Sequence, residues 1–439
     1  MTQASYDAIV IGAGISGLGV SALLSKAGKR VLTLEKAKEI GGRAYSFEYK
    51  GYTTNMGGPR AGLEGGRVDG LFARLGKEPG ERGFFDEIKT LYKGDLIPLP
   101  ELAFRGNLQE AGAIMAAAEE ILESGDLSEY DAITAAEWIT PRVTSREVMD
   151  VNRFSAIVMT TLPRLEDIAA SAFFEAIRIT RSNPRIYLAA RGYGDFMRIL
   201  AETSIENGGE VRTRARVDEI LMEGDCVRGV VVKSGGGKPE RIEAPLVIVA
   251  LPIWELFEMV DESAFSDDFV AQVKHLDKKS AIFGITAALR EPIYDGKFFV
   301  LTDGERCGYP ISGFMASNVT PSLAPKDGHL LEVCCQCDFE IGDDRARLQK
   351  TIEHLEEDLE TMFPGWREPV IWKKSYFHWE EPARNAGRAG VFRPASKAPG
   401  VEGLYFAGDT VASRALPGLE CAADSALLCG QEILGTLPA

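Results

Sequence analysis

The sequence predicts an α/β protein, α+β overall, in which a domain built on a parallel sheet is interleaved with a smaller domain of mixed sheet and helices. A short apolar strand, a helix and a second strand follow one another within the first 35 residues. Strand patterns recur at 208–250 and 403–407, with different material between them. A βαβ unit indicates parallel strands. The separated recurrences indicate two discontinuous domains rather than a row of consecutive ones.

Composition and charge are typical of a globular protein and exclude several classes. Of the 439 residues, 45% are apolar and 26% are charged, which argues against a disordered, collagen-like or polytopic membrane protein. Lys and Arg number 49 against 65 Asp and Glu, a net charge of −16, so nucleic acid is not an expected partner. The first predicted strand begins within ten residues of Met1, and the cytoplasm is the expected compartment.

The seven cysteines predict neither a disulfide framework nor a metal site. Their number is odd and they are spread over the chain. Cys334, Cys335 and Cys337 lie close together, but within an apolar run that predicts a strand, and their spacing fits no common zinc pattern. Buried thiols are the favoured interpretation.

A glycine-rich turn directly follows the first strand and opens the predicted helix 15–27: Gly12-Ala13-Gly14-Ile15-Ser16-Gly17. In such a turn Gly12 allows the tight bend, Gly14 lets a pyrophosphate approach the backbone, and Gly17 lets the helix pack on the sheet. The helix N-terminus offers free N–H groups to the phosphates. This context predicts a Rossmann-type dinucleotide site.

The end of the second predicted strand carries a carboxylate, Glu35, with Lys36 beside it. Glu35 lies at the spacing from the glycine turn at which an acidic residue binds both hydroxyls of an adenosine ribose. The same carboxylate would repel a 2′-phosphate. These features leave FAD and NAD open as the dinucleotide.

Two further stretches of small residues favour a flavin. Gly41-Gly42-Arg43-Ala44 permits close backbone approach, and Arg43 can neutralise a diphosphate. A second stretch offers a bare backbone against which a planar ring can lie; it contains Asn55, Gly57, Gly58, Pro59 and Arg60. Taken alone, either stretch could also be an ordinary surface loop.

These residues resemble the FAD superfamily that includes phytoene desaturases, carotenoid isomerases, protoporphyrinogen oxidases and monoamine oxidases. The stretch 41–44, with Ser46 and Gly51 behind it, is similar to the second fingerprint of that superfamily. Asn55 stands where the family usually has Asp. The resemblance implies FAD as the cofactor and an oxidoreductase activity.

Three later segments carry the resemblance along the chain. Residues 208–220 resemble the family strand in which the backbone of a valine, here Val217, pairs with adenine. Ala250-Leu-Pro resembles the family's sheet exit, and 403–409 its closing motif, in which Gly408 and Asp409 hold the ribityl or pyrophosphate part. The last helix is then expected to open under flavin N1 and O2 with Gly418, Leu419 and Ala422.

The predicted domains follow from these segments. Residues 1–70, 192–252 and 395–439 form the expected FAD-binding domain, and 71–191 and 253–394 the expected substrate domain. The FAD is expected to be non-covalent, because neither Cys nor His sits in a convincing attachment motif. Cys421 is the thiol expected nearest to the ring.

The branch of the superfamily is predicted from two comparisons with its motifs. Residues 317–329 are similar to a segment of phytoene desaturase-like and carotenoid isomerase-like members. The lysine that amine oxidases place near flavin N5 aligns with Gly284, and Gly418 aligns with an aromatic-cage tyrosine if Glu420 matches the family's glutamate. We therefore expect desaturation, saturation or isomerisation of carbon–carbon bonds in an apolar or conjugated substrate.

Two alternatives remain at this stage. One is an amine or protoporphyrinogen-type flavin oxidase. The other, from a different class, is a non-catalytic prenyl-binding protein of the GDP-dissociation-inhibitor type. The sequence identifies no catalytic acid or base and no electron acceptor.

The surroundings of the substrate are harder to predict. Residues 177–191 combine apolar side chains with four arginines, so they could line the substrate entrance or contact a membrane surface, although a solvated face is favoured. Trp379 could flank the substrate cavity or belong to the core. A small apolar substrate is thus the expected partner, and a peripheral membrane contact is the alternative to the favoured solvated face.

Overall fold

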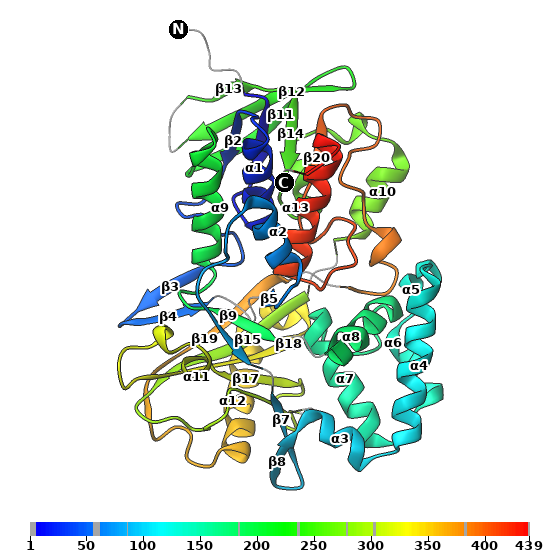
Figure 1. Cartoon of the computed structure of the whole chain (residues 1–439), viewed down its shortest axis with the longest axis vertical. Helices are drawn as coiled ribbons and strands as arrows, with labels where there is room; N and C mark the ends of the chain where they lie inside the picture. Colours follow the sequence, from blue (N-terminus) through cyan, green and yellow to red (C-terminus); the bar gives the residue numbers. More distant parts are fainter. Residues whose placement is uncertain are drawn as a thin grey trace.

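The computed structural model describes residues 6–55, 62–85, 87–182, 185–234, 238–277, 280–301, 304–381 and 384–437. It has two lobes, one around a parallel sheet and the other around a larger mixed sheet (Figure 1). The fold is the predicted mixture of helices and sheets. Within the described residues, no helix combines the length and apolar character needed to cross a bilayer.

The parallel sheet has five strands, drawn from widely separated parts of the chain. Their spatial order is β10 (Glu210–Arg212), β2 (Val31–Leu34), β1 (Ala8–Ile11), β14 (Leu246–Val249) and β20 (Leu404–Phe406), and all neighbours are parallel. Every residue of β1 and β2 is buried. Both faces of such a sheet are covered, which explains their continuous apolar sequences.

A helical layer covers one face of this sheet. It consists of α1 (Ile15–Lys26), α9 (Gly194–Glu206), α13 (Leu419–Leu434) and α2 (Arg67–Leu75), of which α1, α9 and α13 lie side by side (Figure 1). Ala8 and Val10 of β1 belong to the core under these helices. The expected first and last helices are therefore neighbours in space.

An antiparallel sheet and a short helix cover the opposite face. Ile9 and Ile11 of β1 pack into this second core. Its elements are β11 (Ala215–Glu223), β12 (Cys226–Ser234), β13 (Glu240–Glu243), α10 (Asp267–His275) and the 3-10 helices Ile253–Glu258 and Glu262–Ala264.

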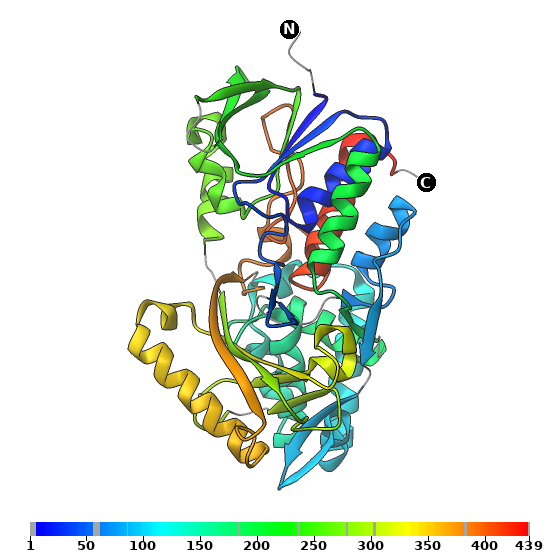
Figure 2. The same ribbon diagram turned by 90° about the vertical axis from the view of Figure 1, so that its left-hand side faces the viewer.

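The second lobe is built on a seven-stranded sheet. Its order is β19 (Val370–Glu381), β15 (Ser280–Leu289), β18 (His329–Cys337), β17 (Ile311–Met315), β16 (Phe298–Leu301), β7 (Ile88–Tyr92) and β8 (Asp95–Pro98). Neighbours are antiparallel except β16 and β7. Helix α12 (Arg345–Met362) packs on one face, as Figure 2 shows. Strand alternation sends Cys335 and Cys337 to that side and Cys334 to the other.

A group of helices beside the seven-stranded sheet completes the second lobe (Figure 1). They are α3 (Leu99–Arg105), α4 (Leu108–Ser124), α5 (Ser128–Ala132), α6 (Ala135–Ile139), α7 (Arg146–Thr160) and α8 (Ala170–Ser182), with a 3-10 turn at Thr140–Arg142. The sequence Thr134-Ala-Ala-Glu137 predicts a helix start, and the structure confirms it, because the Thr134 side chain and Glu137 form a capping box. The smaller elements are β3 (Ser46–Tyr49), β4 (Tyr52–Asn55), β5 (Gly62–Leu63), α11 (Ala316–Val319) and 3-10 turns at Pro321–Leu323, Phe339–Asp343 and Gly390–Phe392.

The sequence pattern over residues 68–191 predicts a mainly helical segment, and this prediction is partly wrong. Besides β7 and β8, this range contains β6 (Arg82–Phe85) and β9 (Ile186–Ala189), which pair with each other. Strand β7 pairs with β16, about two hundred residues later in the chain. Such short strands form by pairing with strands that are distant in the sequence, so local periodicity does not indicate them.

Candidate active site

A cavity of about 450 Å³ has walls from both lobes. Four predicted cofactor segments reach it because they follow the carboxyl ends of β1, β2, β14 and β20. Ligands of doubly wound sheets bind at this edge. The predicted cofactor residues that line the cavity are Gly12, Gly14, Ile15, Ser16, Glu35, Lys36, Gly42, Arg43, Ala250, Gly408, Asp409, Gly418, Leu419 and Ala422.

The glycine turn leaves bare backbone at the cavity wall. Gly12 has φ +102°, and a Cβ there would lie 2.7 Å from the Ala250 oxygen. A Cβ on Gly17 would lie 2.0 Å from the Gly12 oxygen, so this glycine lets α1 approach the turn. A Cβ on Gly14 would have the Gly41 oxygen as its nearest neighbour, at 3.9 Å. Space therefore remains at the second glycine for a ligand's phosphates.

Glu35 is buried and its carboxylate is held by backbone amides. Oε2 accepts from the Ala13 N–H at 2.9 Å, and Oε1 accepts from the Ala37 N–H at 2.7 Å. Ala13 thus orients Glu35 rather than lining the cavity. A carboxylate oxygen accepts more than one hydrogen bond, so both oxygens retain capacity for ribose hydroxyls.

Some predicted cofactor residues do not line the cavity. Gly17 acts in helix packing. Val217 lies in β11, and the Ala215 N–H of this strand donates to the Glu35 backbone carbonyl oxygen at 2.8 Å. The Val217 side chain, however, belongs to a buried core. Its pairing with adenine stays a prediction. The remaining predicted residues fall outside the described part of the chain: Gly57, Gly58, Pro59 and Arg60.

Arg43 and Asp409 meet at the cavity wall although they come from opposite ends of the chain. Arg43 Nη2 lies 2.6 Å from Asp409 Oδ1 and 2.7 Å from Oδ2. The sequence assigned each residue separately to the phosphate or ribityl part of a flavin dinucleotide. The structure joins them in one ion pair, which fixes the loop after β2 to the loop after β20.

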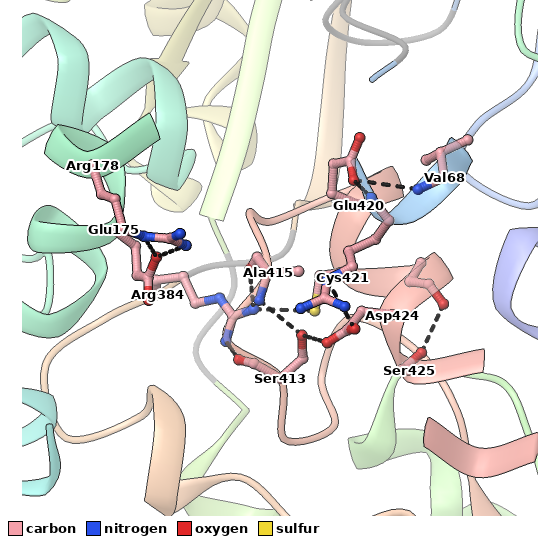
Figure 3. A network of polar contacts seen from close by, with 12 residues as sticks. Val68, Glu175, Arg178, Arg384, Ser413, Ala415, Glu420, Cys421, Asp424 and Ser425 are labelled. Atoms are coloured by element: carbon pink, nitrogen blue, oxygen red, sulfur yellow. Dashed lines mark hydrogen bonds and ion pairs between the residues drawn. The ribbon is translucent and has the colours of Figure 1, made fainter. Parts of the chain in front are cut away.

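Two buried arginines support the same loop, and the sequence analysis missed both. Arg393 Nη1 donates to the Asp409 carbonyl oxygen. Arg384 donates at 2.8 Å to the Ser413 and Ala415 oxygens and lies 3.1 Å from the Cys421 sulfur (Figure 3). Burial, and then the nearby Arg384 charge, lower the pKa of Arg393 to about 9, so it stays protonated at neutral pH. Both arginines occur singly in irregular segments, and no motif marked them.

The N-terminus of α13 opens at the cavity through Gly418, which has φ +84°. A Cβ on Gly418 would meet nothing within 4 Å, so the tyrosine expected in an amine-oxidase cage is replaced by open space. Glu420, in the first turn of α13, accepts from the backbone N–H groups of Leu63 at 2.8 Å and Val68 at 3.3 Å; Figure 3 shows the contact with Val68. It thereby caps the start of α2.

The second lobe supplies the opposite wall of the cavity, and that wall is mainly apolar. Its lining side chains are Phe85, Met159, Ile186, Ile282, Phe298 and Phe314, with Thr161, Ser312, Cys334 and Gln336 as the more polar members. None of the described lining residues from β6, β9 and β15 to β18 is charged. This half of the cavity suits an uncharged, largely apolar molecule.

The position aligned with the amine-oxidase lysine has no room for any side chain. Gly284 pairs with Cys334 on one side and Tyr376 on the other. A Cβ there would lie 2.1 Å from the Val333 oxygen and 2.6 Å from the Tyr376 hydroxyl. Tyr376 therefore packs over the glycine. Burial raises the pKa of its phenol, so the hydroxyl stays neutral.

Other residues considered in the sequence lie elsewhere. Trp379 is 45% exposed, packs against Phe377 and is not among the lining residues, so its proposed place beside the cavity is not supported. In the segment 177–191, Arg178 pairs with Glu175 and Arg185 with Glu64, while Ile186 lines the cavity.

The cavity fits FAD on structural grounds. The start of α1 has Gly14 at its N-cap with no side-chain hydrogen bond, which leaves N–H groups to bind phosphate. The Glu35 carboxylate faces the same cavity at the ribose position. A second helix N-terminus, that of α13, opens farther along and can stabilise negative charge on a flavin ring.

Comparison with known proteins agrees with this site. The family model "Flavin containing amine oxidoreductase" matches residues 15–434. The chain is 23% identical to the chloroplastic prolycopene isomerase of Daucus carota, with 96% of this chain and 76% of that protein aligned. It is 50% identical over 56 residues to (S)-6-hydroxynicotine oxidase of Paenarthrobacter nicotinovorans, but this match spans only 12% of the chain and 13% of the relative.

Solved structures show the same fold. An oxidoreductase from Methanosarcina mazei superposes with a TM-score of 0.77 at 21% identity, covering 98% of this chain and all of that one. Putrescine oxidase bound to putrescine gives a TM-score of 0.71 at 15% identity, with 99% and 100% coverage. A family match over almost the whole chain, joined to a cavity shaped for a flavin dinucleotide, places this FAD-dependent oxidoreductase in the flavin-containing amine oxidoreductase family.

Proposed function

We propose that the protein acts on carbon–carbon bonds, desaturating, saturating or isomerising an apolar or conjugated substrate. The observation that carries this proposal is the uncharged, largely apolar wall opposite the cofactor residues. FAD, when bound, supplies hydride exchange with a substrate carbon. The protein's part is to bind the substrate, exclude water from it and hold it against the ring.

The residues around Gly284 support this reading over amine oxidation. A neutral amine needs a hydrogen-bonding or π-face partner beside the ring to gain stabilisation in the transition state. Gly284 offers neither, and the nearby Tyr376 hydroxyl is directed to the Val333 oxygen at 3.4 Å. Gly418 also provides no aromatic face. An apolar substrate gains about 25 cal/mol per Å² from burial and needs neither group.

Amine oxidation is the second candidate, and the comparisons support it as a class. The family description names amine oxidoreductases, and one superposed structure is a putrescine oxidase. Prolycopene isomerase aligns over more of the chain than the hydroxynicotine oxidase does, which supports the carbon–carbon reading. The glycine turn at residues 12–17 leaves space for the phosphates of a dinucleotide, and this argues against the non-catalytic prenyl-binding alternative.

Anaerobic flavin reduction distinguishes the two candidates. The purified protein is mixed, without oxygen, with polyamines, aromatic amines and a set of conjugated and saturated apolar compounds, while flavin absorbance is followed. We expect the amines to leave the flavin oxidised. Chemically reduced enzyme, mixed with conjugated compounds, tests the saturating direction. Rapid bleaching by a simple amine would overturn the proposal.

The electron acceptor is not identified, and the peripheral membrane contact stays a prediction. The ion pairs of Arg178 and Arg185 favour the solvated face over a membrane-binding one. Cytoplasm remains the expected compartment, and a small apolar substrate the expected partner.

A further inference from the structure

Three of the polar side chains in the apolar wall of the cavity lie on one face of two neighbouring strands. Ser312 in β17 is paired with Cys334 in β18. Gln336 lies two residues farther along β18 and is paired with Ile282. Because strand residues alternate between faces, Cys334 and Gln336 point to the same side. All four residues line the cavity.

Two of these groups are buried without a hydrogen-bond partner. Ser312 is 2% exposed and Gln336 is 7% exposed. Among the described residues, neither Ser312 Oγ nor Gln336 Oε1 makes a hydrogen bond. Buried polar groups are nearly always paired, because an unmade hydrogen bond destabilises the fold. A polar pair retained in an apolar wall therefore points to a ligand that supplies the bonds.

The geometry selects a ligand group that both donates and accepts a hydrogen bond, as a hydroxyl or a neutral amine does. The proposed function favours the hydroxyl. Diagonal neighbours on an antiparallel pair have Cα atoms about 7–8 Å apart, a gap that one oxygen with two hydrogen bonds can span. The Gln336 oxygen requires a donor, whereas a serine hydroxyl can donate or accept. A substrate hydroxyl satisfies both, by donating to Gln336 Oε1 and accepting from Ser312. An ether or carbonyl oxygen satisfies only Ser312, and a hydrocarbon satisfies neither.

We propose that Ser312 and Gln336 form a polar subsite that binds one hydroxyl of the substrate, so that the enzyme acts on a hydroxylated apolar molecule rather than a pure hydrocarbon. The inference rests on the proposed function, since it concerns the substrate of the same cavity. The two residues determine specificity and position the substrate; they take no part in hydride exchange.

Binding of three matched probes tests the subsite on the FAD-loaded enzyme. The probes are trans-cinnamyl alcohol, its methyl ether and trans-β-methylstyrene, which share the conjugated ring. Affinities are measured without oxygen by calorimetry and by perturbation of the flavin absorbance. We expect the alcohol to bind at least about tenfold more tightly than the hydrocarbon, the ratio that one net hydrogen bond gives, with the ether between them.

Variants then assign the preference to its residues. Gln336→Leu and Ser312→Ala should each lower the ratio of alcohol to hydrocarbon affinity, and the double variant should bring it close to one, while hydrocarbon binding stays unchanged or becomes tighter. Ser312→Thr should keep the preference because it keeps a hydroxyl. Ile282→Val is the matched control from the same wall, and it should change both affinities by the same factor. Only variants with wild-type FAD content and melting temperature are compared.

Four outcomes would overturn the inference. Wild-type enzyme that binds alcohol and hydrocarbon equally has no such subsite. Equal weakening of both probes by Gln336→Leu would mean a packing role. A shifted absorption maximum in the ligand-free Gln336→Leu variant would mean that this side chain contacts the flavin. If no conjugated probe binds while amines reduce the flavin, the proposed function fails as well, which separates that failure from the first three.

Discussion

Arg43 and Asp409 form a two-contact ion pair across the cofactor side of the cavity, with Nη2–Oδ distances of 2.6 and 2.7 Å. The Asp409 side chain is almost fully buried, whereas that of Arg43 is partly exposed. The pair joins the loop after β2 to the loop after β20. Removing the cation would leave a buried carboxylate without its counter-charge, which is costly in a protein interior.

The first prediction concerns this pair. Arg43→Ala should lower FAD affinity by about ten- to a hundredfold and destabilise the fold by roughly 1–3 kcal/mol, with solvent screening of Arg43 limiting the loss. FAD titration of the stripped protein and thermal unfolding measure the two effects. Arg198→Ala is the control, because Arg198 pairs with Asp195 and Glu202 on an exposed helix face. Asp409→Asn combined with Arg43→Ala should cost less than the sum of the single changes; simple additivity would show that the pair is not coupled.

The second prediction concerns Glu35. Glu35→Ala should weaken FAD binding by roughly 1.5–3 kcal/mol, the range for hydrogen bonds to a charged group. Glu35→Gln should weaken FAD binding less than Glu35→Ala does, because it keeps an acceptor for the Ala13 N–H but loses the charge. Fluorescence titration of the stripped protein with FAD measures both, with the exposed Glu39→Ala as the control. Unchanged FAD affinity in Glu35→Ala would mean that another group holds the ribose.

The third prediction concerns pH and a buried acid, Glu332. Its Oε1 accepts from the Thr54 hydroxyl at 3.0 Å and the Asn55 N–H at 3.3 Å, while Oε2 has no partner among the described residues. Burial raises the pKa of Glu332 from its ordinary 4.5 to about 7. The folded state therefore holds this proton more tightly than the unfolded chain does. Stability from this group is complete below pH 4.5 and is lost as pH rises to about 7.

Glu332→Gln removes that titration. Relative to wild type, the variant should gain stability on going from pH 4.5 to pH 8, by on the order of 3 kcal/mol. Melting temperatures of the FAD-loaded proteins at several pH values measure the difference. The exposed Glu340→Gln should show no such trend. A difference between Glu332→Gln and wild type that does not change with pH would contradict a raised pKa.

The fourth prediction concerns the attachment of FAD. The Cys421 thiol is fully buried, lies 3.1 Å from Arg384 Nη2 and is absent from the cavity lining. We expect acid precipitation to leave the yellow colour in solution, and chromatography of the released flavin to show FAD rather than FMN. Yellow colour that stays in the acid pellet of the wild-type protein, but not in that of Cys421→Ser, would instead identify a covalent bond to this thiol.

The cofactor half of the site could be predicted from the sequence because its determinants are local. A glycine turn between a strand and a helix, followed by Glu35 at the end of the next strand, needs only the backbone rules of one βαβ unit. Fourteen of the predicted cofactor residues accordingly line one cavity. The capping box at Thr134 was predictable for the same reason, since both of its hydrogen bonds stay within four residues.

Only the tertiary structure decided which residues face the substrate. All ten residues of β15 are buried, so its sequence shows no alternation that would tell the cavity face from the face under α12. Strand register placed Ser312 beside Cys334 and set Tyr376 over Gly284. Irregular chain carries Arg393 to the Asp409 carbonyl oxygen and Arg384 to the Ser413 and Ala415 oxygens of the same loop. A strand that is buried on both faces lacks the alternation of apolar and polar residues that would show which face is which. The pairing of strands far apart in the chain cannot be predicted from the local sequence.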